Sequence, residues 1–395
     1  MRVIVAHEGK QHVNQLLVGL SKQGWLQRFY VGFASNHLPK FLLQSTRLAH
    51  WLKKKQFDGF DSQLIRSHYV STLLSRLTKD HLKHIQITFR LFDSWVATSL
   101  KREDKFDVLI GYENCNLLAF RAAKQSQKLT ILDLAQIHHH TIKKIQQNFP
   151  VTDLSASQTA LVDRRKQAAL AYTDYVLALS SFATQSLTDN GISRNRIYEV
   201  NLGIDPTHFC PAPKRKDGTF QLLFTGTITY RKGLEPLISA FRNLNLPDAE
   251  LLLVGPVGDA GALLTQCTGA IRHIPFLHHE DLVAYYQQAD VFVFPSYLDS
   301  WGQVVLEAMA CGTPVIISDN TGAKDAVAKG GGFVVPTGDE GALQEKIRYV
   351  YEHRDEAERM GREARRVAEQ YTWANYHQQI ADALTDIAHR ENITL

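Results

Sequence analysis

The amino-acid sequence predicts an α/β protein with two doubly wound domains. Short apolar runs, typical of parallel strands buried on both faces, alternate with longer helical patterns, and this series occurs twice. The chain has 395 residues, which is more than a single hydrophobic core usually holds. A segment rich in Gly, Pro and Asp, "NLGIDPTHFCPAPKRKDGTF", separates the two series and predicts a linker with the boundary near Gly203.

This boundary assigns residues 1–203 to the first domain and residues 204–372 to the second. In the first domain, strands are expected at Val3–Ala6, Phe29–Phe33, Val108–Gly111, Thr130–Leu134, Tyr175–Leu179 and Arg196–Val200. In the second domain, strands are expected at Gln221–Thr225, Glu250–Val254, Asp290–Phe294, Pro314–Ile317 and Phe333–Val335. A helix is expected between Gln303 and Cys311.

Composition narrows the class of protein. The sequence lacks an apolar run long enough to cross a membrane, its first residues favour a β-strand over a signal peptide, and its four well-separated cysteines suit reduced thiols. We therefore expect a cytoplasmic protein. Residues 1–203 carry 27 Lys and Arg against 15 Asp and Glu, a net charge of +12, whereas the remainder carries 17 against 25, a net charge of −8. The first domain is thus expected to meet something anionic: a membrane surface, an anionic acceptor or nucleic acid.

The segment from Lys40 to Phe60 concentrates part of this positive charge. It mixes apolar residues with Arg47 and a run of lysines at positions 53–55. A basic amphipathic helix that lies on the inner face of the cell membrane has such a composition. A surface helix with solvated lysines is the alternative, so peripheral membrane association stays open.

The segment between Phe294 and Cys311 predicts a binding site at the end of a strand. Open parallel sheets bind ligands at the carboxyl ends of their strands, next to helix N-termini whose partial positive charge suits a phosphate. Asp299, just before the expected helix, can accept hydrogen bonds from sugar hydroxyls. Glu307, inside the helix among apolar neighbours, can accept two hydrogen bonds from a ribose diol. A carboxylate at this position needs such partners, because burying it without them would be costly. A carboxylate paired within the core is the alternative for Glu307.

The segment "LLFTGTITYRKG" predicts the cations that such a site needs. A strand ends at Gly226, and Arg231 and Lys232 lie in the turn before the next helix. Both would point towards the same cleft, where Arg offers a two-pronged donor and Lys a point charge to a diphosphate. A solvated basic loop is the alternative, and the second phosphate-binding element in the same domain argues against it.

These segments resemble the retaining glycosyltransferase family 4, whose GT-B fold has two Rossmann-like domains that face each other across a cleft. The resemblance rests on "TGTITYRKG", "DSWGQVVLEAMACGTPVI" and "GIDPTHF", and it covers most of residues 110–375. One departure is Asp299, where the family pattern has Glu. The shorter carboxylate leaves the identity of the transferred sugar open.

The resemblance implies a role for each matching residue. Arg231 and Lys232 would hold the donor diphosphate, Glu307 the ribose, and Asp299 the transferred sugar. The donor-binding set is Gly226, Arg231, Lys232, Phe276, Leu277, Asp299, Ser300, Trp301, Gly302 and Glu307. The acceptor side comprises Glu8, Gly9, Asn114 and His138. The catalytic set is His138, Arg231, Lys232 and Asp299.

His138 is the imidazole expected beside the sugar, where it could donate a hydrogen bond and stabilise developing charge. It is the first of three consecutive histidines, so a metal bound by His138, His139 and His140 is the alternative. Consecutive side chains rarely converge on one ion, and no Cys or carboxylate cluster accompanies these. The resemblance implies neither metal nor cofactor, because cationic side chains and helix dipoles neutralise the diphosphate. It also implies that the last helix, within residues 373–395, crosses back onto the first domain.

The expected function is a retaining transfer of a hexose from UDP- or GDP-hexose to a glycan or glycolipid acceptor, in the biosynthesis of surface polysaccharides. Two alternatives from other classes are a sugar-nucleotide epimerase and a non-catalytic protein that binds nucleotide sugars. Nucleic acid is not an expected partner, because the basic residues lack interleaved aromatic side chains.

Overall fold

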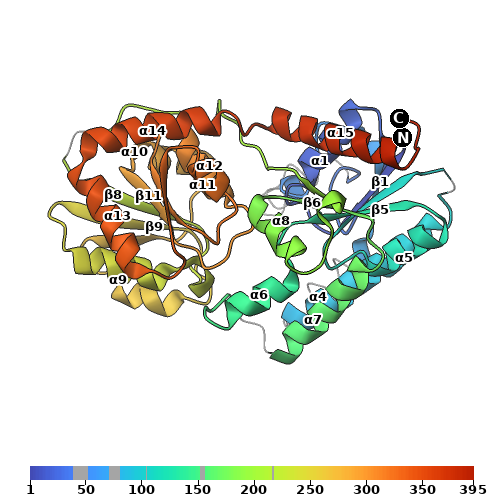
Figure 1. Cartoon of the computed structure of the whole chain (residues 1–395), viewed down its shortest axis with the longest axis horizontal. Coiled ribbons are helices and arrows are strands. Elements are labelled where there is room, and N and C mark those ends of the chain that lie inside the picture. The colour runs from blue at the N-terminus through green and yellow to red at the C-terminus, as the bar shows by residue number, and fades with distance from the viewer. Residues whose placement is uncertain (39–51, 71–80, 104, 152–155, 216–217) are drawn as a thin grey trace.

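In the computed structural model, two parallel β-sheets lie side by side and helices flank each of them (Figure 1). The structure describes residues 1–38, 52–70, 81–103, 105–151, 156–215 and 218–395. Residues 40–51 of the basic segment Lys40–Phe60, where a membrane-surface helix is expected, lie outside these residues. Within the described residues, no helix combines the length and the apolar character that crossing a bilayer requires.

The first sheet has the strand order β3-β2-β1-β4-β5-β6-β7, and its neighbouring strands are parallel. Its strands are β1 Val3–His7, β2 Leu26–Val31, β3 Ile65–Ser67, β4 Val108–Tyr112, β5 Leu129–Leu134, β6 Tyr175–Ala178 and β7 Ile197–Glu199. Its helices are α1 Val13–Lys22, α4 His81–Leu100, α5 Leu117–Gln125, α6 His139–Gln146, α7 Ala156–Leu170 and α8 Ser181–Thr188. Alternate residues of β1 enter different cores: Val3 and Val5 join the core with α1, and Ile4 and Ala6 join the core with α4 and α5. Helices therefore cover both faces of this sheet.

The second sheet has the strand order β10-β9-β8-β11-β12-β13 and is also parallel throughout. Its strands are β8 Phe220–Thr225, β9 Ala249–Val254, β10 Ile271–Ile274, β11 Val291–Phe294, β12 Val315–Ser318 and β13 Gly332–Val335. The helices that follow are α9 Leu234–Leu244, α10 His279–Gln288, α11 Gln303–Ala310, α12 Lys324–Val327, α13 Glu340–Glu352, α14 Arg354–Ala368 and α15 Trp373–Arg390.

Both sheets have a switch point, where the strand order reverses: between β1 and β4 in the first sheet, and between β8 and β11 in the second. The loops that leave the carboxyl ends of such neighbouring strands run to opposite faces and open a crevice between them. Each domain therefore has one crevice that the topology alone makes available to a ligand.

The predicted strands are all present, with ends displaced by three residues or fewer. Two strands were not predicted, β3 and β10, and each forms an outer edge of its sheet. An edge strand has one open side and does not need a continuous apolar run. Arg66 in β3 and Arg272 in β10 are exposed accordingly.

The last helix, α15, returns to the first domain and packs against α1, although it follows the second domain in the chain (Figure 1). His377 Nε2 lies 3.0 Å from the side-chain oxygen of Gln15, and His377 Nδ1 lies 3.1 Å from Lys22 Nζ. The chain thus crosses between the domains twice, once near Gly203 and once near Thr372. At this crossing Ile204 and Thr372 form a parallel bridge.

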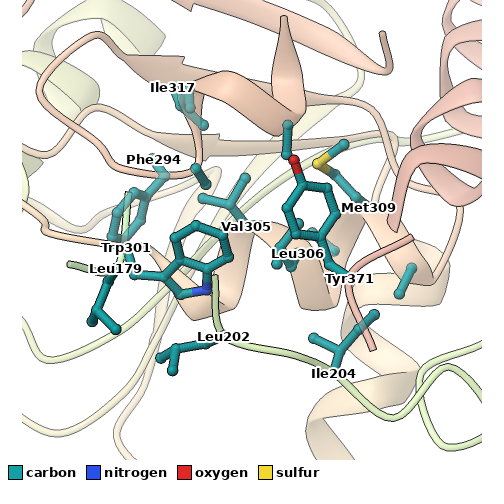
Figure 2. Packing of buried hydrophobic residues seen from close by; sticks show 14 of the residues in the cluster. Leu179, Leu202, Ile204, Phe294, Trp301, Val305, Leu306, Met309, Ile317 and Tyr371 are labelled. Atoms are coloured by element: carbon teal, nitrogen blue, oxygen red, sulfur yellow. The ribbon is translucent and has the colours of Figure 1, made fainter. Parts of the chain in front are cut away.

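The apolar core continues through this double crossing. Figure 2 shows Trp301 and Val305, at the start of α11, packed beside Leu202 and Ile204 of the linker and Tyr371 of the return segment. These side chains are buried, with at most 9% of each surface exposed. The two domains are therefore joined by packed apolar side chains as well as by the chain itself.

The close approach at Gly203 gives a test of the crossing. A Cβ atom there would lie 2.3 Å from the backbone atoms of Thr372 and Trp373, which cannot move aside as a flexible side chain would. We expect Gly203→Ala to lower the free energy of unfolding by about 1–3 kcal/mol, the usual cost of overpacking. The measurement is urea denaturation.

Gly341→Ala is the matched control, because the nearest atom to its added Cβ is a side-chain oxygen at 3.4 Å in the first turn of α13. It should be neutral or stabilise the protein by up to about 1 kcal/mol. Equal effects of the two substitutions would contradict the described crossing.

Candidate active site

The switch point of the second sheet brings together the cations and the carboxylate that the sequence predicts for a donor site. Arg231 and Lys232 follow β8, and Asp299 follows β11, its neighbour in the sheet. Lys232 Nζ lies 2.5 Å from Asp299 Oδ2, and an Arg231 guanidinium nitrogen lies 4.0 Å from the same oxygen. Arg231 also donates a 2.6 Å hydrogen bond to the carbonyl of Leu298.

Gly233 allows the turn that carries both cations to approach β11. Its φ of 69° lies in the left-handed region, and a Cβ there would lie 2.0 Å from the carbonyl oxygen of Pro295. The "RKG" of the sequence is therefore a structural unit, in which the glycine lets the two preceding cations reach the end of the neighbouring strand.

The ion pair between Lys232 and Asp299 is largely shielded from solvent, with 12% and 19% of the two side chains exposed. Burial raises the pKa of Asp299, but the charge and hydrogen bond of Lys232, aided by Arg231, outweigh this effect and hold that pKa below its ordinary value. Asp299 is thus a carboxylate near neutral pH. It accepts a hydrogen bond from Lys232 at the position where the sequence analysis expects a sugar hydroxyl.

A cavity of about 470 Å³ opens beside this pair, between the two domains. The second domain contributes Arg231, Leu298, Asp299 and Ser300, and the first domain contributes residues from five segments. The first-domain residues that line it are Gln11, Phe89, Tyr112, Asn114, Ala135, Gln136, Ile137, Ile142, Val151, Thr159, Val162, Asp163 and Lys166. The Ser300 hydroxyl donates a 2.5 Å hydrogen bond to the carbonyl of Ala135 and so ties the two walls together.

Glu307 lines a different cavity, of about 390 Å³. It is 6% exposed and accepts a 2.9 Å hydrogen bond from the Tyr286 hydroxyl. Gln303, the first residue of α11, lines the same cavity, and Gln11 of the first domain lines both cavities. The two acids of the D-x7-E motif therefore flank the N-terminus of α11 from separate chambers of the cleft.

The remaining expected donor residues follow three strands of the second sheet. Gly302 is the N-cap of α11, and Gly226 directly follows β8 with a φ of 144°. Phe276 is 57% exposed, with Lys54 of the first domain over its ring at 6.0 Å, whereas Leu277 packs on the core. The Trp301 side chain points into the core (Figure 2).

The acceptor-side residues divide into two groups. Glu8 and Gly9 follow β1, and burial raises the pKa of Glu8. Asn114 follows β4 and lines the 470 Å³ cavity. The structure does not bring His138 to that cavity: Ala135, Gln136 and Ile137 line it instead.

His138 is 4% exposed because the chain turns after Ile137 and uses it as the N-cap of α6. Its Nδ1 accepts a 3.3 Å hydrogen bond from the backbone N–H of His140. It faces a small cavity of about 20 Å³, together with Asn116 and His139. Proximity in sequence to the end of β5 was thus a poor guide to the position of this ring.

The three histidines do converge, contrary to the reasoning that set a metal aside. Their ligand nitrogens lie within 4.8 Å of one another, and the rings of His138 and His139 are 4.3 Å apart. Burial, aided by neighbouring histidines and by Lys166, lowers the pKa of both His138 and His139 to about 4. The nearby positive charge of Lys166 opposes a cation there.

A buried pair that sequence reasoning missed joins His12 to Asp133. His12 Nε2 lies 2.9 Å and 3.1 Å from the two carboxylate oxygens of Asp133, and 6% and 4% of the two side chains are exposed. Asp133 stands in the apolar strand "TILDL", where a carboxylate needs a partner. That was the available signal, but 121 positions separate the pair, and the strand order is what joins them.

Comparison with known proteins agrees with this geometry. Residues 210–367 match the family model described as Glycosyl transferases group 1. The second domain is a group 1 glycosyl transferase domain. This domain contains the Arg231–Lys232–Asp299 cluster, as the resemblance in sequence implied.

Relatives of this chain include a D-inositol 3-phosphate glycosyltransferase of Paenarthrobacter aurescens, 28% identical over 54% of this chain and 56% of that protein. A glycogen synthase of Mycobacterium tuberculosis is 29% identical over 51% of each chain. The chain thus spans about half the length of these curated relatives.

Solved structures confirm the GT-B fold. Sucrose-phosphate synthase from Thermosynechococcus elongatus superposes with a TM-score of 0.69 at 19% identity, over 99% of this chain and 100% of that one. Anabaena HepE, solved in complex with UDP-glucose, superposes with a TM-score of 0.66 at 16% identity, over 98% and 100%.

The buried imidazoles predict a loss of stability in mild acid. Burial lowers the pKa of His7 to about 3, and His138 and His139 titrate at about 4. Below pH 6.5 these histidines bind protons in the unfolded chain but stay neutral in the folded protein. The free energy of unfolding therefore falls as the pH drops from 6.5 towards 4. We expect each of the three histidines to lower the free energy of unfolding by about 1–2 kcal/mol between pH 7.5 and pH 5.

The measurement is urea denaturation at both pH values. His139→Asn should reduce the loss between them, whereas the exposed control His389→Asn should leave it unchanged. A loss that is the same in wild type and His139→Asn would show that His139 is not a neutral buried imidazole.

Proposed function

We propose that the protein is a retaining glycosyltransferase that moves a hexose from UDP- or GDP-hexose to a glycan or glycolipid acceptor. The observation that carries this proposal is the convergence of Arg231 and Lys232 on Asp299 at the switch point of the second sheet, where Arg231 and Asp299 line a cavity between the domains. The group 1 glycosyl transferase model matches the domain that holds all three residues.

The donor diphosphate has a ready place between the two cations and the N-terminus of α11. A diphosphate there would take over the charge that Asp299 now supplies to Lys232, because a largely buried ammonium needs an anionic partner. Asp299 would then be free to accept hydrogen bonds from the hydroxyls of the sugar. The unliganded ion pair thus keeps both side chains charged and in position until the donor arrives.

The reaction itself needs little covalent chemistry from the protein. The bond between the anomeric carbon and the phosphate oxygen breaks, a bond to the acceptor oxygen forms on the same face, and the departing phosphate oxygen takes the acceptor's proton. Arg231, Lys232 and the helix dipole stabilise the charge on the departing diphosphate. We propose that no metal or cofactor takes part.

The acceptor would enter from the first domain, and the wall of the 470 Å³ cavity favours one with an apolar part. Polar and apolar side chains share this wall. Its apolar members are Phe89, Ile137, Ile142, Val151 and Val162. This composition supports a glycolipid acceptor in surface-polysaccharide synthesis. The excess of positive charge in residues 1–203 supports an enzyme that works in the cytoplasm, beside an anionic membrane.

Removing one cation tests the donor site. A panel of UDP- and GDP-hexoses should raise the melting temperature of the wild-type protein for the true donor. Lys232→Ala should weaken binding of that donor by about 1.5–3 kcal/mol, the worth of a hydrogen bond to a charged group. Isothermal titration calorimetry measures the affinity, and Arg231→Ala provides a second variant.

Lys346→Ala is the control, because this partly exposed lysine lies on α13, where it pairs with its neighbour Glu345. It should bind the donor as the wild type does. Full affinity in Lys232→Ala would contradict the diphosphate assignment, and conversion of the donor to its epimer without an acceptor would favour an epimerase.

A further inference from the structure

The His12–Asp133 pair lies on the cleft but has no part in the proposed donor site. His12 is the N-cap of α1, yet its side chain does not cap that helix and turns to Asp133 at the carboxyl end of β5 instead. Asp133 therefore fixes the ring through Nε2. The other ring nitrogen, Nδ1, remains for a ligand.

The ring faces the chamber that Glu307 lines. His12 from the first domain and Gln303 and Glu307 from α11 border the same 390 Å³ cavity. Gln11, next to His12, also borders the larger cavity that holds Arg231 and Asp299. A ligand that extends along the N-terminus of α11, from Asp299 to Glu307, must therefore pass His12.

The pair favours the protonated form of His12 on this side of the cleft, beside the carboxylate of Asp133. Burial lowers the pKa of His12, but the charge and hydrogen bonds of Asp133 outweigh it and raise that pKa above its ordinary value. Several titratable groups surround the pair from the packed elements and across the cavity. They are His7 of β1, Tyr112 of β4, Asp133 of β5, Tyr376 of α15, Asp205 and His208 of the linker, and Glu307 of α11.

Of the two neighbouring histidines His7 and His12, His12 is the one that carries a positive charge. His7 stays neutral, because burial lowers its pKa to about 3. Glu307 and Asp205 bring negative charge to the cavity, which would repel a phosphate unless a cation offsets them.

We propose that His12 is a donor-binding residue of the first domain, whose imidazolium donates a hydrogen bond from Nδ1 to the phosphate next to the ribose. The inference rests on the proposed function, which places a nucleotide sugar along α11 with its ribose at Glu307. It assigns the two phosphates to different domains: the ribose-proximal one to His12, and the sugar-proximal one to Arg231 and Lys232.

This division makes closure of the cleft depend on the donor. An anion held by His12 on one side and by Arg231 and Lys232 on the other attracts both domains at once. Neither domain alone would complete the site, and Asp133 acts as a positioning residue that keeps the imidazole charged and oriented.

The experiment compares nucleoside, nucleoside monophosphate and nucleoside diphosphate, using the base that the wild-type protein prefers, by isothermal titration calorimetry at pH 7.5. His12→Gln should lower the affinities for the monophosphate and the diphosphate equally, by about tenfold, and leave the affinity for the nucleoside unchanged. Lys232→Ala should lower the affinity for the diphosphate more than the affinity for the monophosphate. Asp133→Asn should reproduce the effect of His12→Gln, and the double variant should add little, since the two residues act as a unit.

The control is His37→Gln, an exposed histidine of the first domain, which should bind all three probes as the wild type does. The wild-type protein gives a readout without any substitution. Its affinity for the monophosphate should fall as the pH rises from 7.5 through the raised pKa of His12, because the phosphate no longer titrates there while the imidazolium loses its proton. In His12→Gln this fall should be much smaller.

The outcomes separate the two proposals. If the wild type binds none of the probes, the proposed function fails and this inference fails with it. If Lys232→Ala weakens the diphosphate while His12→Gln binds every probe normally, the donor site stands and the assignment of His12 is wrong. A loss of thermal stability in His12→Gln with unchanged affinities would identify the pair as a purely structural link between α1 and β5.

Discussion

The ion pair between Lys232 and Asp299 is the interaction on which the second domain's site depends. It connects the loop after β8 to the loop after β11 across the switch point, and most of both side chains is shielded from solvent. A buried charge that loses its partner destabilises a protein strongly, whereas exchange for another partner of the same sign does not. The pair is therefore stable without a ligand, and an anionic ligand can replace Asp299 as the partner of Lys232. A diphosphate site requires this property.

The two sheets give this pair its setting. Each sheet is parallel, so the carboxyl ends of all its strands lie on the same side, and the crevice at its single switch point opens there. The return of α15 to α1 and the contact of Gly203 with Thr372 hold the two domains together at one end. Residues of both domains line two cavities, one with Asp299 and the other with Glu307, and Gln11 borders both. An elongated ligand with charged and uncharged parts suits such a divided cleft better than a compact one.

Much of this architecture is encoded locally and could be predicted. Buried parallel strands require continuous apolar runs, so the inner strands and α11 were evident, whereas the edge strands β3 and β10 were not. Arg231, Lys232 and Asp299 could be placed together because adjacent strands of a doubly wound sheet end side by side. His12 and Asp133 could not, since their contact depends on the order of strands far apart in the sequence. His138 and Glu307 show a second limit, because the local turn of the backbone decides which chamber a side chain faces.

A structure of the protein with bound UDP or GDP tests the central claim most directly. The account predicts that the diphosphate lies at the N-terminus of α11, that the Lys232 ammonium contacts a phosphate oxygen, and that Asp299 has separated from Lys232. A nucleotide bound elsewhere, with the ion pair intact and Arg231 still on the carbonyl of Leu298, would contradict it.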